Sequence, residues 1–260
     1  MNVLICGIGG RMGYEVLKLA KEGYRGAVPV AGYDINPVNA ENVPVYNDLA
    51  KIKEKPDVII DFSHHAGTKA LLKYAVANHI PTVVATTGHS EEELALIKKC
   101  AAEIPLFHAA NMSLGVALLV ELAKITAKTF PDADIEIIEK HHNRKLDAPS
   151  GTALAIANAL KTVRRKAAFV FGRHGNAKRE QNEIGIHAVR MGNIVGEHEV
   201  IVGTDTQTIT LKHEAHSRAL FAEGALAAAA FLCRMTPGLY DMKSLVGGEK
   251  KDTAMSGAHA

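Results

Sequence analysis

The chain has 260 residues, 47% of them hydrophobic, so it can bury a sizeable core in one large or two modest domains. Lys and Arg total 30 against 28 for Asp and Glu, a near-balance that argues against a nucleic acid or a membrane surface as a partner. The three cysteines are odd in number and far apart in the sequence, which argues against a disulfide framework or a zinc site and indicates a reducing, cytoplasmic compartment. The opening segment MNVLICGIGG does not resemble a signal peptide, and no run of about 18 apolar residues predicts a transmembrane helix.

The first part of the chain alternates short apolar strands with helices. This alternation predicts an α/β fold, a doubly wound parallel sheet of the Rossmann type. The predicted strands are Asn2–Cys6, Val28–Tyr33, Asp57–Asp61, Pro81–Ala85 and Pro105–His108. The predicted helices are Met12–Glu22, Thr68–Asn78 and Glu91–Ala102.

The pattern changes after about Met112, where we expect a second, α+β domain. It begins with a long apolar helix over Leu114–Lys128 and a half-exposed strand over Asp134–Lys140, and another helix follows Gly151. Three later strands have no helices between them, which predicts antiparallel pairing. These strands are Gly185–Arg190, Val195–Val202 and Thr206–His213.

The closing apolar helix, Arg218–Leu232, is predicted to pack back onto the first domain. The first domain then comprises residues 1–112 and 219–260, and the second comprises residues 113–218. The segment Lys161–Asn182 is rich in Arg, Lys, Gly and Asn and is predicted to be a solvated loop. The small, polar tail from Gly247 is predicted to be disordered.

A glycine-rich turn follows the first predicted strand and leads into the first predicted helix. Glycines let the backbone turn tightly and approach a pyrophosphate, whose charge the free N–H groups of the helix N-terminus would then hold. The turn departs from a strict GxGxxG pattern because its last glycine comes one place late, at Gly13. The candidate cofactor-binding residues of this turn are Gly7, Ile8, Gly9, Gly10, Arg11 and Met12.

Asp34 follows the second predicted strand, where a carboxylate can accept hydrogen bonds from both hydroxyls of an adenine ribose. This arrangement favours NADH and would repel the 2′-phosphate of NADPH, although Arg11 could partly compensate. The alternative is a glycine turn that binds nothing. Its place at the first strand–helix junction favours the dinucleotide.

Two further loops follow the fourth and fifth predicted strands. Ligands bind at the carboxyl ends of strands in open α/β sheets, so both loops could line a nicotinamide. The alternative is that both are plain strand-ending turns. The candidate residues are Ala85, Thr86 and Thr87 in one loop and Ala109, Ala110, Asn111 and Met112 in the other.

The turn Ser150-Gly151-Thr152 opens a predicted helix and could bind an anion. Its two hydroxyls and its free backbone N–H groups suit a carboxylate, which the helix dipole also favours. The alternative is that Ser150 only caps the helix.

Basic residues precede this turn in the segment Glu139–Pro149. His142 and Lys145 could bind a second carboxylate, so the group suits a small dianionic substrate. His141 or Lys145 could donate a proton as a hydride arrives. The alternatives are a solvated charged loop or a metal site, but adjacent histidines rarely chelate one ion and no zinc-like spacing completes a ligand set.

These motifs resemble those of the dihydrodipicolinate reductase family, also called 4-hydroxy-tetrahydrodipicolinate reductase. The matching segments run over nearly the whole chain and stop near Val246. The stretch KHHNRKLDAPSGTA is the most specific of them. The others are GIGGRMG, DFSHHAGT, ATTG, AANMSLGV, IGIHAVRMGNIVGEHEV and HSRALFAEGALAAAAFL.

The resemblance implies a Rossmann-like domain completed by the C-terminal helix. It also implies a substrate domain whose mixed sheet mediates a homotetramer. The implied reaction is NADH- or NADPH-dependent reduction of a small cyclic dicarboxylate, 4-hydroxy-tetrahydrodipicolinate, to tetrahydrodipicolinate on the route to diaminopimelate and lysine. For the mechanism, we expect the domains to close about hinges near Met112 and Arg218.

Carried over residue by residue, the resemblance makes His141 and Lys145 catalytic and His142 a substrate contact. It makes Ser150 to Thr152 the carboxylate-binding turn and assigns Gly7 to Met12, Asp34 and the two later loops to the cofactor. Ala85 stands where the family commonly has glycine and Met112 where it commonly has phenylalanine, so we expect altered cofactor affinity rather than lost activity.

Three other functions are to be distinguished from this one. A related amino-acid dehydrogenase would turn over amino or keto acids. A non-catalytic NAD-responsive module would bind cofactor yet tolerate loss of Lys145, and a metal-dependent hydrolase using His141 and His142 would be sensitive to chelators.

Overall fold

A computed structural model describes residues 1–36 and 39–247 of the chain. Within these ranges no helix is both long enough and apolar enough to cross a membrane. The tail that the sequence predicts to be disordered lies outside the described residues, apart from Gly247 itself.

The first sheet has seven strands in the order β12-β6-β5-β4-β1-β2-β3, and every neighbouring pair is parallel. This confirms the predicted doubly wound sheet. Two of its strands, β3 and β12, are short edge strands that the sequence analysis missed. The strands are β1 (Asn2–Cys6), β2 (Val28–Tyr33), β3 (Val45–Tyr46), β4 (Val58–Asp61), β5 (Thr82–Val84), β6 (Pro105–His108) and β12 (Gly238–Tyr240).

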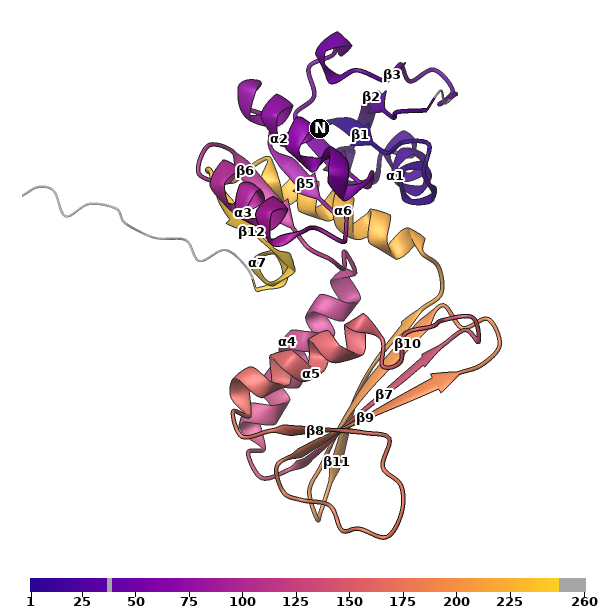
Figure 1. Cartoon of the computed structure of the whole chain (residues 1–260), viewed down its shortest axis with the longest axis vertical. Coiled ribbons are helices and arrows are strands. Elements are labelled where there is room, and N and C mark those ends of the chain that lie inside the picture. Colours follow the sequence, from indigo (N-terminus) through magenta and orange to yellow (C-terminus); the bar gives the residue numbers. More distant parts are fainter. Residues whose placement is uncertain (37–38, 248–260) are drawn as a thin grey trace, which may run out of the picture.

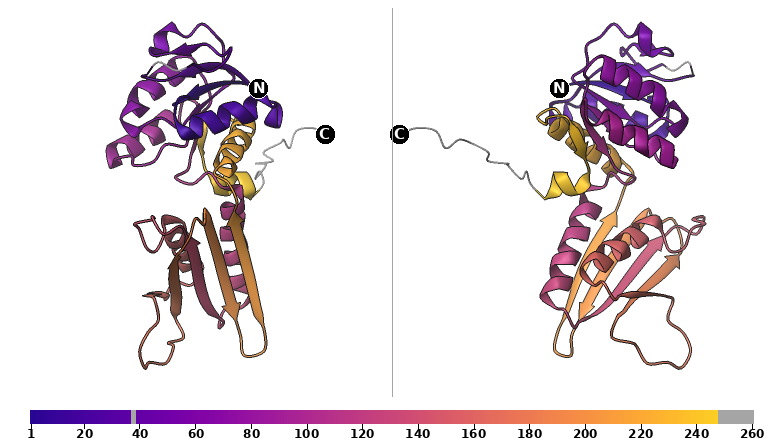
Figure 2. Two further views of the ribbon diagram at one scale, coloured as in Figure 1. Left: turned by 90° about the vertical axis from the view of Figure 1, so that its right-hand side faces the viewer. Right: turned by 60° about the vertical axis from the view of Figure 1, so that its left-hand side comes forward.

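Helices cover both faces of this sheet (Figures 1 and 2). Alternate side chains of β1 enter two different cores, with Val3 and Ile5 on the face of α1 and α6, and Leu4 and Cys6 on the face of α2 and α3. The helices are α1 (Arg11–Lys21), α2 (Thr68–Ala77), α3 (Glu91–Cys100) and α6 (Ala219–Leu232). Three short 3-10 helices lie at Tyr24–Gly26, Leu49–Lys51 and His65–Gly67.

Helix α6 carries the chain back from the second sheet to the first (Figure 1). It is apolar around most of its circumference, and Ala225, Leu226 and Leu232 are fully buried in the core beside β1. A side chain at Gly224 would overlap the carbonyl oxygen of Met112, so the helix backbone passes directly against the end of the loop after β6. The short helix α7 (Met242–Val246) follows β12.

The second sheet has five strands in the order β11-β10-β7-β9-β8. The prediction of antiparallel pairing is correct for β10 with β11 but wrong for β9 with β10, because β7 lies between them, antiparallel to β10 and parallel to β9. Burial explains the order, since the isoleucines of β7 are buried best with an apolar strand on each side. The strands are β7 (Asp134–His141), β8 (Ala168–Phe171), β9 (Glu183–Arg190), β10 (Gly196–Gly203) and β11 (Thr208–Ala215).

Strand β8 lies inside the segment predicted to be a solvated loop, and the helix that begins at Gly151 extends into this segment as far as Val163. The prediction is therefore wrong for Lys161–Val163 and for Ala168–Phe171. The four residues AFVF pair in parallel with β9 at the edge of the sheet. Overall composition concealed them, because Arg, Lys, Gly and Asn dominate the flanking residues.

Helices α4 (Leu114–Thr129) and α5 (Gly151–Val163) cover one face of the second sheet. No helix in the described ranges covers its other face (Figures 1 and 2). Helix α4 runs from the edge of the first sheet down the length of the second. Helix α5 begins at the end of the second sheet that is nearer to the first sheet, since Thr152 contacts Asn111 in the loop after β6.

Candidate active site

The strand order of the first sheet reverses at β1, where β2 lies on one side and β4 on the other. Ligands of open parallel sheets bind outside the carboxyl ends of the strands at such a point. A pocket of 590 Å³ lies there. Its lining comes from the ends of β1, β2 and β4, and includes Gly7, Gly9, Gly10, Asp34, Phe62, Ser63 and His64.

Glycines are required in the turn after β1. Gly7 has φ +74°, and a Cβ there would lie 2.8 Å from the Phe62 carbonyl oxygen. A Cβ at Gly13 would overlap the carbonyl oxygen of Gly7, so the late glycine allows α1 to pack against the turn. The Gly10 N-cap has no side chain to occupy the first N–H groups of α1, and the turn therefore fits a pyrophosphate.

Asp34 lies on the wall of the same pocket, and its carboxylate is already hydrogen-bonded to the backbone. One oxygen accepts from the Gly9 N–H at 2.9 Å, and the other accepts from the Asn36 N–H at 3.0 Å. These bonds tie the end of β2 to the glycine turn. Each carboxylate oxygen has a further lone pair for a ribose hydroxyl.

A second pocket, of 490 Å³, shares Phe62, Ser63 and His64 with the first and continues toward the ends of β5 and β6. Two adjoining pockets along one edge of the sheet suit the two halves of a dinucleotide. The remaining lining residues are Met12, His65, Ala85, Thr86, Thr87, Ala110, Asn111, Met112 and Phe221. Of the predicted cofactor-binding residues, Ile8, Arg11 and Ala109 line neither pocket.

A buried carboxylate organises the loops that line the second pocket. Asp61, at the end of β4, accepts hydrogen bonds from the Ser63 N–H at 3.0 Å, the Ser63 hydroxyl at 2.5 Å and the Thr86 hydroxyl at 3.0 Å. Burial raises the pKa of Asp61, and these donors offset only part of the rise. The carboxyl group thereby joins the loops after β4 and β5.

Asn111 connects the two sheets at the site. Its side-chain N–H donates to the Thr152 hydroxyl at 3.1 Å, and its side-chain oxygen accepts from the Ser113 N–H at 2.9 Å. A residue at the edge of the second pocket thus contacts the turn that opens α5.

Ser150 caps α5 and is itself buried. Its hydroxyl oxygen accepts from the Ala153 N–H at 3.2 Å and lies 3.1 Å from Nε2 of His198. Burial lowers the pKa of His198 to about 4, and the neighbouring His141 adds to the effect, so His198 is neutral at pH 7. The Ser150 hydroxyl therefore lies against an uncharged ring within a basic neighbourhood.

His141 ends β7 and is held by a carboxylate. Its Nδ1 lies 2.5 Å from a carboxylate oxygen of Glu139, and its ring packs edge-on against His198 with centroids 5.2 Å apart. Both nitrogens of the Arg190 fork donate to Glu139, at 2.6 and 2.8 Å. The sequence analysis proposed His141 but assigned no role to Glu139, Arg190 or His198.

The basic loop after β7 places further cations beside His141. Lys145 pairs with Asp147 at 2.8 Å and stays partly exposed. Burial, together with the charges of Arg144 and Arg218, lowers the pKa of His142, so this ring is neutral at pH 7. The structure therefore gathers His141, His142, Lys145 and the Ser150 turn at one end of the second sheet.

The residues that the sequence analysis missed carried a signal in the sequence. Phe62, Ser63, His64 and His65 follow β4 directly, and the rule that ligands bind at carboxyl ends of parallel strands applies to them as well. Glu139 lies on the same face of β7 as the buried Ile135 and Ile137, and a charge on a buried strand face indicates a specific partner.

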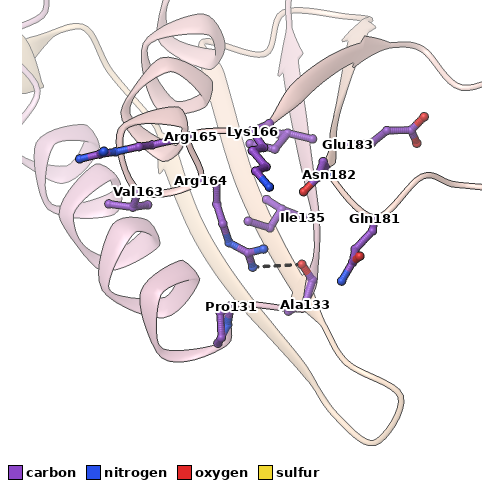
Figure 3. Close-up of a pocket in the computed structure, with 12 residues that line it drawn as sticks. Pro131, Ala133, Ile135, Val163, Arg164, Arg165, Lys166, Gln181, Asn182 and Glu183 are labelled. Carbon is purple, nitrogen blue, oxygen red and sulfur yellow. Dashed lines mark hydrogen bonds between the residues drawn. The ribbon is translucent and has the colours of Figure 1, made fainter.

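A separate pocket of 360 Å³ lies on the second sheet, lined by residues between Pro131 and Ile184 (Figure 3). Arg164 beside it donates to the carbonyls of Ala127, Phe130 and Ala133 at 2.6–3.3 Å, which caps the end of α4. Its guanidinium is engaged in holding the fold. In the described ranges no group of three or more His, Cys, Asp or Glu side chains is arranged to hold a metal ion.

The parallel sheet, its paired pockets and the adjoining basic turn are those of an oxidoreductase with a Rossmann-type, dinucleotide-binding fold. Family models described as "Dihydrodipicolinate reductase, N-terminus" and "Dihydrodipicolinate reductase, C-terminus" match residues 1–112 and 115–246. The chain belongs to the dihydrodipicolinate reductase family.

Curated relatives span almost the same length. A 4-hydroxy-tetrahydrodipicolinate reductase of Caldanaerobacter subterraneus subsp. tengcongensis is 51% identical over 248 residues, which cover 95% of this chain and 98% of that protein. One of Clostridium tetani is 41% identical, with 95% and 97% covered.

Solved structures show the same architecture. The dipicolinate-bound dihydrodipicolinate reductase of Paenisporosarcina sp. TG-14 has a TM-score of 0.79 and 27% identity, over 93% of this chain and 97% of that one. A C. glutamicum DAP dehydrogenase has a TM-score of 0.58 at 14% identity, over 96% of each chain, which shows a shared fold alone. The fold is therefore shared with this dehydrogenase, while the high sequence identity is to the reductases.

Proposed function

We propose that this chain reduces 4-hydroxy-tetrahydrodipicolinate to tetrahydrodipicolinate with a nicotinamide cofactor, on the route to diaminopimelate and lysine. The hydrogen bond from Asn111 to Thr152 is the main support for this proposal, because it joins the second pocket to the turn suited to a substrate carboxylate. A substrate ring bound on that turn would lie next to the second pocket, where the nicotinamide is proposed to bind.

In this proposal each part of the site has one task. Gly7 to Gly13 hold the pyrophosphate with backbone N–H groups, and Asp34 accepts from the adenine ribose. The hydroxyls of Ser150 and Thr152 and the N–H groups of Gly151 and Thr152 bind one substrate carboxylate, while the Ser150 N–H stays bonded to Glu139. His142 and Lys145 assist with the other carboxylate.

A bound nicotinamide supplies the hydride. Lys145 or His141 supplies the proton, so hydride and proton together add two hydrogens to the substrate. The 4-hydroxyl of the substrate is absent from tetrahydrodipicolinate, and water leaves to complete the balance. Closure of the two sheets about hinges near Met112 and Arg218 would exclude solvent and strengthen the cationic field around the dianion.

We propose NADH as the favoured cofactor. Asp34 presents a carboxylate where NADPH would carry its 2′-phosphate, and Ile35 and Asn36 follow it without a neighbouring arginine. The 590 Å³ pocket would accept the adenosine of either cofactor, so the preference rests on charge.

We further propose residues 1–112 and 219–260 as the cofactor domain and residues 113–218 as the substrate domain. The burial of α6 in the core beside β1 supports this division, although one family model continues through α6. The uncovered face of the second sheet supports a homotetramer, which sedimentation would test. A cytoplasmic location completes the proposal and rests on the three widely spaced cysteines.

The direct test is oxidation of NADH by the purified protein when pyruvate and aspartate semialdehyde are supplied together with dihydrodipicolinate synthase. We expect oxidation that requires the synthase, with NADPH slower in parallel. Dipicolinate, the ligand of the Paenisporosarcina reductase, should inhibit it. Intact NADH binding without oxidation would contradict the reaction, and oxidation with a panel of amino or keto acids would favour a related dehydrogenase.

A further inference from the structure

Glu139 is a fully buried charge next to the substrate turn. One of its oxygens, Oε2, lies 2.5 Å from Nδ1 of His141 and accepts a hydrogen bond from Nη1 of Arg190 at 2.8 Å. The other receives the second Arg190 nitrogen at 2.6 Å and the backbone N–H of Ser150 at 3.0 Å. A buried carboxylate is costly unless its oxygens are paired in this way.

This single carboxylate joins two functional parts that belong to different elements. His141 ends β7, while Ser150 opens α5. We propose that Glu139 is a positioning residue for the reduction, holding His141 in one tautomer and orientation while it fixes the backbone of the carboxylate-binding turn. The inference rests on the proposed roles of His141 and Ser150.

The tautomer follows from the hydrogen-bond partners. An ionised carboxylate only accepts, so Nδ1 of His141 carries a proton in both the neutral and the charged ring. Proton donation to the substrate would come from Nε2 of the charged ring, which leaves the Nδ1–H tautomer behind. In the described part of the chain, Nε2 of this ring makes no hydrogen bond. Gly196 lies beside it, where a Cβ would come within 3.1 Å of Nε2, so the absent side chain keeps that nitrogen open toward the site.

The carboxylate also stays charged. Burial raises the pKa of Glu139, but the hydrogen bonds from Arg190, His141 and the Ser150 N–H outweigh it and hold the pKa below its usual range. Arg190 further donates to the carbonyl of Asp147 at 2.7 Å, so the same fork secures the basic loop.

The chain offers a matched control on the same strand. Glu136 lies three places earlier, on the opposite face of β7. It too pairs with an arginine, Arg179, and a histidine, His187, whose Nε2 is 2.8 Å away. The partners of Glu136 lie away from the Ser150 turn. A substitution of Glu136 therefore measures the effect of losing an Arg–Glu–His cluster that has no contact with the proposed substrate site.

The experiment compares Glu139→Gln with Glu136→Gln. In Glu139→Gln we expect kcat to fall by about 100-fold, since loss of a residue that orients a functional group commonly costs 10–100-fold. KM for the dicarboxylate and Kd for dipicolinate should rise by about tenfold, because the Ser150 N–H loses its ionic acceptor. KM for NADH should not change, and Glu136→Gln should keep all four constants.

Nitrogen-15 spectra of labelled histidine supply a readout that a purely structural role would not move. We expect the Nδ1–H signature of His141 in the unaltered protein and in Glu136→Gln, and its loss in Glu139→Gln. If Glu139→Gln does not fold, Glu139→Asp replaces it, because aspartate keeps the charge opposite Arg190 but is too short to reach both His141 and Ser150. Glu139→Asp should also lower kcat, by about tenfold.

A folded Glu139→Gln or Glu139→Asp variant with unchanged kcat and an unchanged His141 tautomer would overturn the inference. An equal loss of kcat in Glu136→Gln would overturn it as well, since the effect would then be one of the sheet. Failure of the proposed function looks different, because the unaltered protein would then neither oxidise NADH with the synthase product nor bind dipicolinate.

Discussion

Helices α1 and α5 both begin at a turn suited to an anion, but the two turns are built differently. The turn before α1 is made of glycine backbone, and its N-cap Gly10 offers no side chain. The turn before α5 is capped by Ser150, whose backbone and hydroxyl belong to a buried cluster of Glu139, His198 and Ser150 itself. In the proposed function the first turn binds its ligand by shape and free N–H groups, whereas the second depends on the polar and charged side chains around it.

Because the two turns are built differently, substitutions in each should impair a different property of the protein. Substitutions in the first turn act by sterics and should affect cofactor affinity and packing. Substitutions around the second act by electrostatics and proton supply, and should affect turnover with the cofactor still bound.

The largest effect is expected when both candidate proton donors are removed. His141→Ala with Lys145→Ala should lower kcat by about a thousandfold or more, because positioned proton donors contribute about 10²–10⁴-fold each. The Kd for NADH, measured by fluorescence titration, should stay within about twofold, since neither residue lines the cofactor pockets. Normal turnover in this variant would break the assignment of chemistry to the second turn.

Gly13→Ala should produce the opposite pattern. Its Cβ would overlap the Gly7 carbonyl, so α1 must move away from the turn. We expect NADH affinity to fall by about 100-fold and the free energy of unfolding to fall by about 2 kcal/mol, measured by denaturant titration. The control is Gly151→Ala at the start of α5, where a Cβ meets nothing within 4 Å and folding stability should be kept. Equal stability losses in both variants would contradict the steric explanation.

Acid should destabilise the second turn through His198. The ring has a pKa of about 4 in the folded protein, against 6.5 for an exposed histidine, because it is buried. The unfolded chain therefore binds more protons in this window, and stability falls as the pH falls from about 6.5 toward 4. We expect a contribution of about 2 kcal/mol lost by pH 5, measured by urea unfolding at several pH values. His198→Gln should show a shallower slope, and an identical slope would contradict this origin.

The smallest effect concerns cofactor choice. Asp34→Asn removes the negative charge beside the adenine ribose but keeps a side chain that can contact the Gly9 N–H. The ratio of NADH to NADPH affinity should fall by about tenfold, or about 1.4 kcal/mol. If competition titrations show the same ratio of NADH to NADPH affinity in both proteins, the charge of Asp34 is not the basis of the cofactor preference.

Local patterns in the sequence predicted much of both regions. The five predicted strands of the first sheet begin and end within one residue of their predicted limits, because continuous apolar runs bounded by glycine or charge indicate buried parallel strands. The candidates His141, Lys145 and Ser150 could be predicted from a local excess of basic groups beside a helix start. Asp34 and the glycine turn could be predicted because a phosphate-binding turn needs its glycines at fixed places in the sequence.

The sequence alone therefore determined the doubly wound sheet, the glycine turn and the basic segment before α5, since each depends on residues close together in the chain. Only the tertiary structure decided that β7 separates β9 from β10 and that Asn111 contacts Thr152. It also decided that Glu139 is bound by Arg190 of β9, a strand that is distant in the sequence but adjacent in the sheet. Strand order and buried ion pairing depend on which distant surfaces exclude water together, and no local pattern of residues encodes that choice.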